Sequence, residues 1–286
     1  MSDGMSDGAG DGANDGMSDG VGDGAVDGAA GTAPAETALE ARALVKRFRG
    51  VAAVDGVGLA VRDREVFGVA GLNGAGKSTL LMMLAGVLAP DSGTVLYRGA
   101  DIYGGGARAA NRGSAAMRVG YVPQEIAAFP NLTVLDNLRF FEAAPGKARG
   151  GGAGSRAVTS IEGAAAMVGI GGMLRVKLSD ISGGMKRRLN IAAALVTRPD
   201  VLVMDEPTAG LDAQNRRGIV ALIRELADSG LAVIYTSHQT GELERLSDMI
   251  LVISEGRRVD EGTADELCAR HGARSVDDIL CRLGAQ

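Results

Sequence analysis

The chain has 286 residues, of which 46% are hydrophobic and 23% charged, so it has enough apolar side chains for a globular core. Its formal net charge is −5, but the first 31 residues hold seven Asp and no Lys or Arg, which leaves the remainder close to neutral. The residues after position 31 lack the basic stripe of a dedicated nucleic-acid-binding protein, so no nucleic acid is expected among the partners.

Cysteine usage and apolar runs narrow the class further. Cys268 and Cys281 follow no metal-ligand spacing and form no disulfide framework, which is typical of a reducing cytoplasm. The longest strongly apolar run is Leu80–Ala89, about half of the roughly 20 residues that a spanning helix needs. The N-terminus has neither the basic nor the apolar region of a secretory signal. We therefore expect no membrane span in this chain.

The first 31 residues repeat Asp-Gly with a period of four, from Asp3-Gly4 to Asp27-Gly28. An acidic, glycine-rich segment buries too little apolar surface to offset its ordering entropy, so residues 1–36 are predicted to be a disordered tail. The alternative is calcium binding. Known Asp-Gly calcium repeats use other periods, which favours a solvated tail.

From Thr37 onward, short apolar runs alternate with helical patterns. Four runs predict strands buried on both faces of a parallel sheet: Val66–Ala70, Val201–Met204, Ala232–Thr236 and Met249–Ile253. Apolar residues at helical spacing predict helices between them, at Lys77–Leu88, Thr133–Ala143, Ser160–Val168, Gly184–Thr197 and Gln214–Ser229. The alternation of strand and helix predicts an α/β fold over residues 37–263.

Two glycine-rich stretches, Gly104–Ser114 and Pro145–Ser155, interrupt this alternation and are predicted to be surface loops. The chain between and after them has helical patterns. We therefore predict a helical subdomain, about residues 125–200, inserted into the α/β core. Residues 264–286 remain as a short C-terminal extension.

The segment after the first predicted buried strand fits the pattern G-x-x-x-x-G-K-[ST], as Gly71-Leu72-Asn73-Gly74-Ala75-Gly76-Lys77-Ser78-Thr79. Glycines at a strand-to-helix turn let backbone amides converge on a phosphate chain, and the helix N-terminus adds positive potential. Lys77 is expected to bridge the β- and γ-phosphates, and Ser78 to coordinate Mg²⁺. The alternative is a glycine-rich turn that happens to contain a lysine. The surrounding strand and helix favour the phosphate site.

A second constellation, Asp205-Glu206, directly follows the apolar run Val201–Met204. Carboxylates at the carboxyl end of a buried strand stand where α/β sheets place active sites. Asp205 is expected to hold the hydration shell of Mg²⁺, and Glu206 to polarise the attacking water. Taken alone, a solvated acidic turn would be an equal interpretation, and the neighbouring phosphate loop favours the site.

Ser182-Gly183-Gly184-Met185 opens a predicted helix, with Ser182 as a natural N-cap and two glycines that leave amides bare. This is a second anion site without a lysine of its own. One chain does not need two phosphate cradles. Two chains packed head to tail do, each helix start closing over the nucleotide of the other.

With these motifs, the sequence from about Leu39 to Leu267 resembles the nucleotide-binding subunits of ATP-binding cassette (ABC) transporters. The phosphate loop and Asp205-Glu206 match Walker A and Walker B, and Ser182–Met185 resembles the signature LSGGQ, with Met185 in place of Gln. The resemblance implies roles for four more residues, which are Gln124 in the Q-loop as a metal-site residue, Asp212 in the D-loop, His238 as the switch histidine and Phe48 as the ring that stacks on adenine.

The resemblance implies a P-loop ATPase that binds ATP and Mg²⁺, forms a dimer and drives separate transmembrane permease subunits from the cytoplasmic face of the membrane. The residues after Met185 and the short C-terminal region resemble two-component exporters of drugs, antibiotics or polysaccharides. An importer subunit, a soluble ABC ATPase of translation or repair, and an ordinary P-loop kinase or GTPase are the alternatives. A single cassette without sustained heptads disfavours the soluble ABC proteins. A kinase or GTPase would lack both the signature serine and the distal histidine.

Overall fold

The computed structural model describes Met1 and residues 36–104, 118–143 and 160–285. The chain divides into two units, Met1–Pro34 and Ala35–Gln286. The Asp-Gly tail, the Pro145–Ser155 loop and most of the Gly104–Ser114 loop lie outside the described residues. The second unit carries the helices and strands of the described part of the chain.

The centre of the second unit is a six-stranded sheet in the order β10-β9-β3-β8-β7-β6. Its strands are β3 (Val66–Ala70), β6 (Val119–Val122), β7 (Val201–Met204), β8 (Ala232–Thr236), β9 (Met249–Ser254) and β10 (Arg257–Gly262). All neighbouring pairs are parallel except β9 with β10, which is antiparallel. The prediction of an α/β fold around a parallel sheet is confirmed, and the four predicted strands all belong to it.

Each central strand is buried on both faces. Along β7, Val201 and Val203 belong to one hydrophobic core, whereas Leu202 and Met204 belong to the core on the opposite face. Successive side chains of a strand point to opposite faces, so a strand between two cores has to be apolar at every position. This is the physical reason for the short uninterrupted apolar runs in the sequence.

A second, antiparallel sheet covers one face, in the order β2-β1-β4-β5. It consists of β1 (Thr37–Phe48), β2 (Val51–Arg62), β4 (Ser92–Tyr97) and β5 (Ala100–Asp101). Helix α1 (Lys77–Leu84) contacts strands of both sheets. The predicted end of this helix at Leu88 is wrong, because Gly86 takes a left-handed φ of 73° and turns the chain out of the helix.

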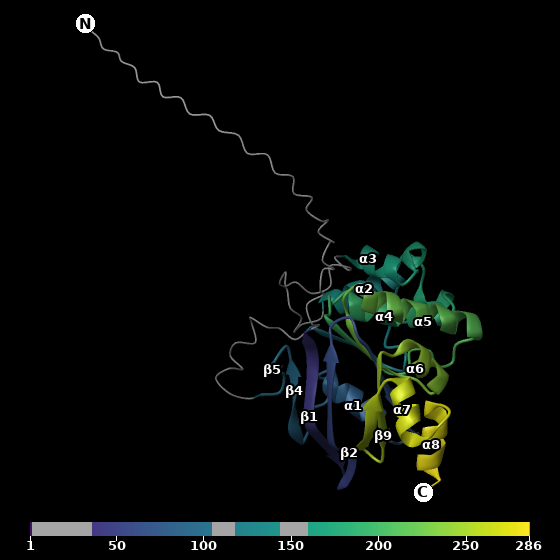
Figure 1. The fold of residues 1–286 in the computed structure, drawn as a ribbon. Helices are drawn as coiled ribbons and strands as arrows, with labels where there is room; N and C mark the ends of the chain where they lie inside the picture. The colour runs from purple at the N-terminus through teal and green to yellow at the C-terminus, as the bar shows by residue number, and fades with distance from the viewer. Residues whose placement is uncertain (2–35, 105–117, 144–159, 286) are drawn as a thin grey trace, which may run out of the picture. The chain divides into compact units, whose positions relative to one another are not determined.

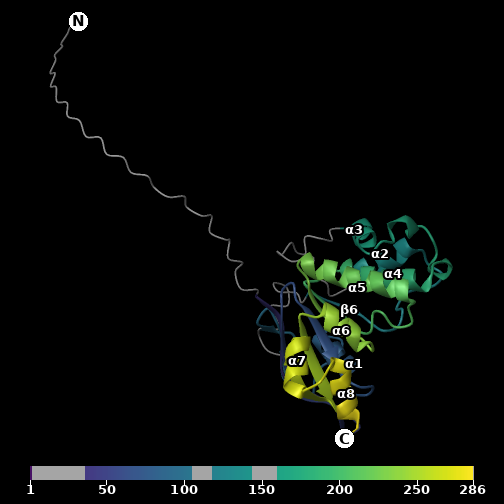
Figure 2. The same cartoon turned by 45° about the vertical axis from the view of Figure 1, so that its right-hand side comes forward.

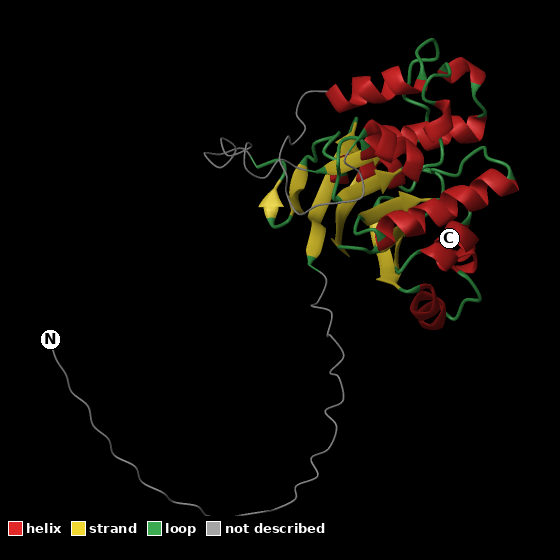
Figure 3. Cartoon of the chain, turned by 90° about the horizontal axis from the view of Figure 1, so that it is seen from above, coloured by secondary structure: helices red, strands yellow, loops and turns green. Residues whose placement is uncertain are grey.

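The remaining helices share one hydrophobic core with the other face of the large sheet, and α2 and α3 reach it by packing on α4. They are α2 (Val134–Ala143), α3 (Ile161–Met167), α4 (Gly183–Leu195), α5 (Ala213–Asp228), α6 (Thr240–Leu246), α7 (Ala264–His271) and α8 (Val276–Gly284), with single 3₁₀ turns at Gly171–Met173 and Leu178–Asp180. Helices α2 to α5 lie together near one end of the sheet, α7 and α8 lie near the other end, and α6 lies between them in contact with α5 and α8 (Figures 1 and 2). In the view from above, the helices, in red, lie beside the strands, in yellow (Figure 3).

The last two helices share the core of the large sheet. Leu267 of α7, together with Val276 and Ile279 of α8, is buried in the same hydrophobic cluster as the strands. Each helix begins with a capping side chain, Thr263 for α7 and Ser275 for α8. The residues predicted as a C-terminal extension therefore contribute apolar surface to the main core.

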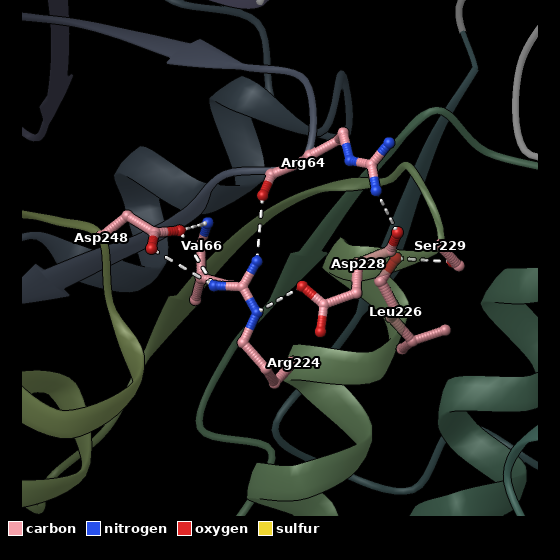
Figure 4. A network of polar contacts seen from close by, with 7 residues as sticks. All are labelled: Arg64, Val66, Arg224, Leu226, Asp228, Ser229 and Asp248. Carbon is pink, nitrogen blue, oxygen red and sulfur yellow. Dashed lines mark hydrogen bonds and ion pairs between the residues drawn. The ribbon is translucent and has the colours of Figure 1, made fainter. Parts of the chain in front are cut away.

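A polar network joins three chain segments at the amino ends of β3, β8 and β9 (Figure 4). Arg224 of α5 donates hydrogen bonds to Asp248, to Asp228 and to the carbonyl oxygen of Arg64, at 3.0–3.3 Å. Asp248 in turn accepts the backbone N–H of Val66, the first residue of β3, at 2.8 Å. The Arg224 guanidinium therefore connects the C-terminal end of α5 to the residues that precede β3 and β9.

Replacing Arg224 with Met should lower the free energy of unfolding by about 1–2 kcal/mol, because the carboxylate and carbonyl acceptors lose a shared donor. Part of this loss should disappear at high salt, since the Arg224 side chain is one-third exposed. Urea unfolding at two salt concentrations measures both effects. The control is Arg42→Met, which breaks an exposed pair with Glu40 and should leave the urea midpoint in place. Equal effects of the two substitutions would contradict the network's role.

Candidate nucleotide-binding site

The loop from Gly71 to Gly76 connects the buried strand β3 to α1, as the phosphate-loop motif requires. Gly74 and Gly76 have φ of 79° and 97°. Gly76 has no room for a side chain, since an added Cβ would lie 2.1 Å from the carbonyl oxygen of Ala53. The Lys77 ammonium donates to the carbonyl oxygens of Gly71 and Leu72 at 2.8 and 3.1 Å, so the lysine folds across its own loop.

The electrostatic environment of Lys77 links the loop to the acidic pair. Burial lowers the pKa of the Lys77 ammonium, and the negative charges of Glu206 and Asp205 oppose this effect. The phosphate loop and the carboxylates, 128 residues apart in the sequence, therefore share one site. Ser78 and Thr79 lie in the first turn of α1, and both are partly exposed.

Asp205 and Glu206 follow β7 directly, and both are buried. The hydroxyl of Thr236, at the end of β8, donates to Asp205 Oδ1 at 2.9 Å and accepts the backbone N–H of Glu206 at 3.0 Å. Glu206 has a φ of 49°, which is rare for a residue with a side chain. Thr236 thus orders this sharp turn. Sequence reasoning placed Thr236 in a strand but did not identify its contact with the acidic pair.

Both carboxylate oxygens of Glu206 have a side-chain partner. The amide nitrogen Nε2 of Gln124 donates to Oε2 at 2.8 Å, and Nε2 of His238 lies 2.7 Å from Oε1. The Glu206 side chain is 7% exposed and that of His238 50%, so the pair bridges the buried edge of the sheet and solvent. Gln124, Glu206 and His238 follow β6, β7 and β8, which are neighbouring parallel strands. Their proximity is therefore a consequence of sheet order.

The helix that begins after Ser182 anchors the loop that carries Gln124. Arg187 donates to the carbonyl oxygen of Gln124 at 2.7 Å, and Asn190 donates to those of Pro123 and Glu125 at 3.1 and 3.0 Å. Sequence reasoning missed both residues. The available signal was their spacing, since positions three apart lie on one face of a helix and both are polar among buried neighbours. Burial lowers the pKa of the Arg187 guanidinium, against the charge of Glu206.

The predicted signature residues form the start of α4. Ser182 is the N-cap, and its hydroxyl oxygen accepts the backbone N–H of Met185 at 3.3 Å. Ser182 and Gly183 are exposed, whereas Gly184 is buried against Asn215 of α5. Within one chain, this exposed helix start has no bond to the Glu206 group among the interactions of the described residues.

Asp212 and Phe48 have different local roles. Asp212 caps α5, accepting the backbone N–H groups of Gln214 and Asn215 at 3.0 and 2.8 Å, and the hydrogen bonds from Asn215 lower the pKa of its carboxyl group. Phe48 ends β1 with its side chain 47% exposed, and the ammonium of Lys46 lies 5.9 Å from the ring centroid. The ring is therefore not a core side chain.

Comparison with known proteins identifies the family of the chain. Residues 54–209 match the ABC transporter family. The chain is 38% identical over 238 residues to the linearmycin resistance ATP-binding protein of Bacillus subtilis (strain 168), which covers 83% of this chain and 73% of that protein. It is 40% identical over 249 residues to the Nod factor export ATP-binding protein I of Paraburkholderia xenovorans (strain LB400), with 86% of this chain and 77% of the relative covered.

The fold is also that of solved ABC proteins. The crystal structure of the ADP conformation of an ATP-binding cassette of an ABC transporter superposes with a TM-score of 0.70 at 25% identity, covering 86% of this chain and 99% of the other. The predicted family, fold and ATPase activity are thereby confirmed. The chain belongs to the ABC transporter family, as a subunit that binds ATP and hydrolyses it to drive transport.

Proposed function

We propose that this chain is the ATPase of an exporter that moves a drug-, antibiotic- or polysaccharide-like molecule through separate permease subunits. The names of its relatives, a resistance protein and an export protein, favour export over the importer alternative. The observation that carries the ATPase mechanism is the carboxylate of Glu206, held by Gln124 and His238 at the edge of the sheet that also bears Lys77.

The triphosphate of ATP would occupy the loop Gly71–Gly76, with Lys77 exchanging its loop carbonyls for phosphate oxygens. The donor set suits Mg²⁺, which prefers oxygen ligands, because the hydroxyl of Ser78, the amide oxygen of Gln124 and the carboxylate of Asp205 belong to segments that converge here. When bound, the ion would neutralise charge on the phosphates. The exposed ring of Phe48 offers a stacking face for adenine.

Hydrolysis requires a base, and Glu206 is the candidate. Gln124 and His238 orient its carboxylate from two sides. The side chain is therefore already ordered before substrate binds. A water molecule that replaces one partner meets a carboxylate still held by the other. Glu206 takes the proton of this water as the water oxygen attacks the γ-phosphorus, the bond from the γ-phosphorus to the bridging oxygen breaks, and ADP leaves. His238 faces the same region as a donor to the developing charge.

The start of α4 indicates a dimer. Ser182 and Gly183 present a capped helix N-terminus to solvent, which suits an anion supplied from outside the chain. In a head-to-tail homodimer, this helix start would close over the ATP bound to the partner's Lys77 loop. Asp212, at the start of α5 close to Gly184, would lie at the same interface.

An apolar surface beside the Q-loop is the proposed contact with the permease. Phe129, Leu132 and Phe140 are each 40–53% exposed, and the rings of Phe129 and Phe140 pack edge to face with centroids 4.9 Å apart. Exposed apolar groups of this kind mark interaction sites. Asn137 fixes this corner by accepting the N–H of Phe129 at 2.7 Å.

Within residues 36–104, 118–143 and 160–285, each helix is too short or too polar to traverse a bilayer. The location that we propose is peripheral, at the cytoplasmic face of the membrane, with the permease subunits as anchor. The surface formed by Phe129, Leu132 and Phe140 would face the permease.

Glu206→Gln should retain ATP binding but lower turnover by about 10²-fold or more, because the amide keeps the size of the side chain and removes the base. With hydrolysis blocked, the protein should change from monomer to dimer when ATP and Mg²⁺ are added, as followed by size-exclusion chromatography.

Adding Ser182→Arg to that variant should abolish the dimer and leave ATP binding to the single chain nearly intact, since Ser182 does not line its own phosphate loop. Thr197→Arg, in the turn that follows the C-terminal end of α4, is the matched control and should still dimerise. Failure of Glu206→Gln to dimerise, alone or with its permease, would contradict the composite site.

Phe48→Ala should weaken ATP binding by about 1–2 kcal/mol, the scale of one base-to-aromatic stack. A stacking face makes no hydrogen bond to the base edge, so GTP should bind almost as well as ATP. Titration calorimetry measures both affinities. Val51→Ala is the control, because Val51 pairs with Phe48 across the β1–β2 turn and is exposed as well. If the parent chain and Phe48→Ala bind ATP with equal affinity, Phe48 does not stack on adenine.

Phe140→Ser should reduce co-purification with the co-expressed permease by roughly tenfold, the usual effect of removing a central aromatic contact. Val259→Ser on β10 removes a comparable exposed apolar side chain away from α2 and should leave co-purification at the parent level. Titration of each isolated variant with ATP verifies its folding. Retention of the permease by Phe140→Ser would place the contact elsewhere on the chain.

A further inference from the structure

Glu242, on α6, is a buried carboxylate outside the group formed by Gln124, Glu206 and His238. Its side chain is 3% exposed. Oxygen Oε2 accepts hydrogen bonds from the hydroxyls of Thr208 at 2.8 Å and Ser237 at 2.9 Å. Thr208 lies two residues after Glu206, and Ser237 directly precedes His238. One carboxylate therefore holds the loops that carry both members of the Glu206–His238 pair.

Arg216, on α5, completes this arrangement from the other side. Its Nε lies 3.5 Å from Glu242 Oε1. One terminal nitrogen donates to the carbonyl oxygen of Leu211, the residue before Asp212, and the other donates to the side chain of Gln239, the residue after His238, both at 3.0 Å. The guanidinium thus connects the turn before α5 to the loop after β8.

The two charges depend on each other. Among the described residues, neither Arg216 Nε nor Glu242 Oε1 has a hydrogen-bond partner, and both atoms are buried. Each therefore compensates the other's charge without a full hydrogen bond. A buried ion pair of this kind is weak evidence for stability, so its retention calls for another explanation.

We propose that Glu242, together with Arg216, is a positioning residue for ATP hydrolysis. It keeps the loops after β7 and β8 in the one arrangement in which His238 meets Glu206, and it ties the turn before Asp212 to that arrangement. This inference rests on the proposed roles of Glu206 and His238. Small displacements of reacting groups cost large factors in rate, so a remote carboxylate has leverage on turnover.

Two substitutions divide the contribution of Glu242. Glu242→Gln keeps the shape of the side chain and one oxygen for the two hydroxyls but loses the charge that faces Arg216, so kcat should fall by about tenfold. Glu242→Leu removes every polar contact, and kcat should fall by about a hundredfold. KM for ATP should change less than about twofold in both, because the phosphate loop is untouched. Glu225→Gln, on the exposed side of α5, is the matched control and should retain the parent kcat.

The chain contains two histidines, which allows a direct readout of the geometry. In a sample labelled with ¹⁵N-histidine, the ring signals of His238 should shift in Glu242→Gln, because its contact with Glu206 is altered. His271, on α7 and 3.0 Å from Asp260, should keep its signals and serves as the internal reference. A merely destabilising substitution would lower the unfolding temperature and leave the folded-state His238 signals in place.

The outcomes separate this proposal from the proposed function. If Glu206→Gln keeps the parent turnover, the role of Glu206 is wrong. If Glu206→Gln is inactive while both Glu242 variants keep the parent kcat and His238 signals, the positioning role is overturned. If Glu242→Leu fails to fold, the kcat and His238 signals of Glu242→Gln and Thr208→Val test the proposal instead. Thr208→Val removes one hydrogen-bond donor to the Glu242 carboxylate at nearly constant volume. A variant of Glu242 that loses kcat while the ring signals of His238 stay unchanged would also overturn the positioning role.

Discussion

Burial of the parallel sheet on both faces is the constraint from which the site follows. A strand with a core on each side has no face left for polar side chains, so β7 is apolar until Met204 and polar from Asp205. Parallel strands bring their carboxyl ends to one edge. Polar groups that are far apart in the sequence therefore meet within hydrogen-bond distance, as Gln124, which lies 82 residues before Glu206, and His238 do at Glu206.

The arrangement of Glu206 and of the loop that carries Gln124 depends on hydrogen bonds from neighbouring residues. Glu206 has an unfavourable backbone conformation, and the surrounding hydrogen bonds of Thr236 hold it there. The loop that carries Gln124 is likewise attached to α4 through Arg187. Charged residues are seldom buried without partners, and among the described residues the buried Arg187 and Glu242 contact the loops that carry Gln124, Glu206 and His238. Preorganisation explains this distribution better than stability does.

Much of this architecture was predictable from sequence, for a physical reason. The runs Val66–Ala70 and Val201–Met204 carry their fold information locally, and the phosphate loop has a fixed spacing. The antiparallel strand β1 escaped prediction because its register shifts break the alternation of buried and exposed residues. The contacts of Arg187 and Thr236 escaped as well, because each joins segments that only the completed fold brings together.

The polar network at the amino edge of the sheet can change the stability of the protein separately from the site at the carboxyl edge. Arg224 and Asp248 join chain segments where β3 and β9 begin, whereas Lys77 and Glu206 lie where strands end. A five-residue strand separates the two edges by about 16 Å, and changes so far apart combine almost additively. The amino edge is thus a region in which heat tolerance can evolve, or be engineered, independently of the chemistry at the carboxyl edge.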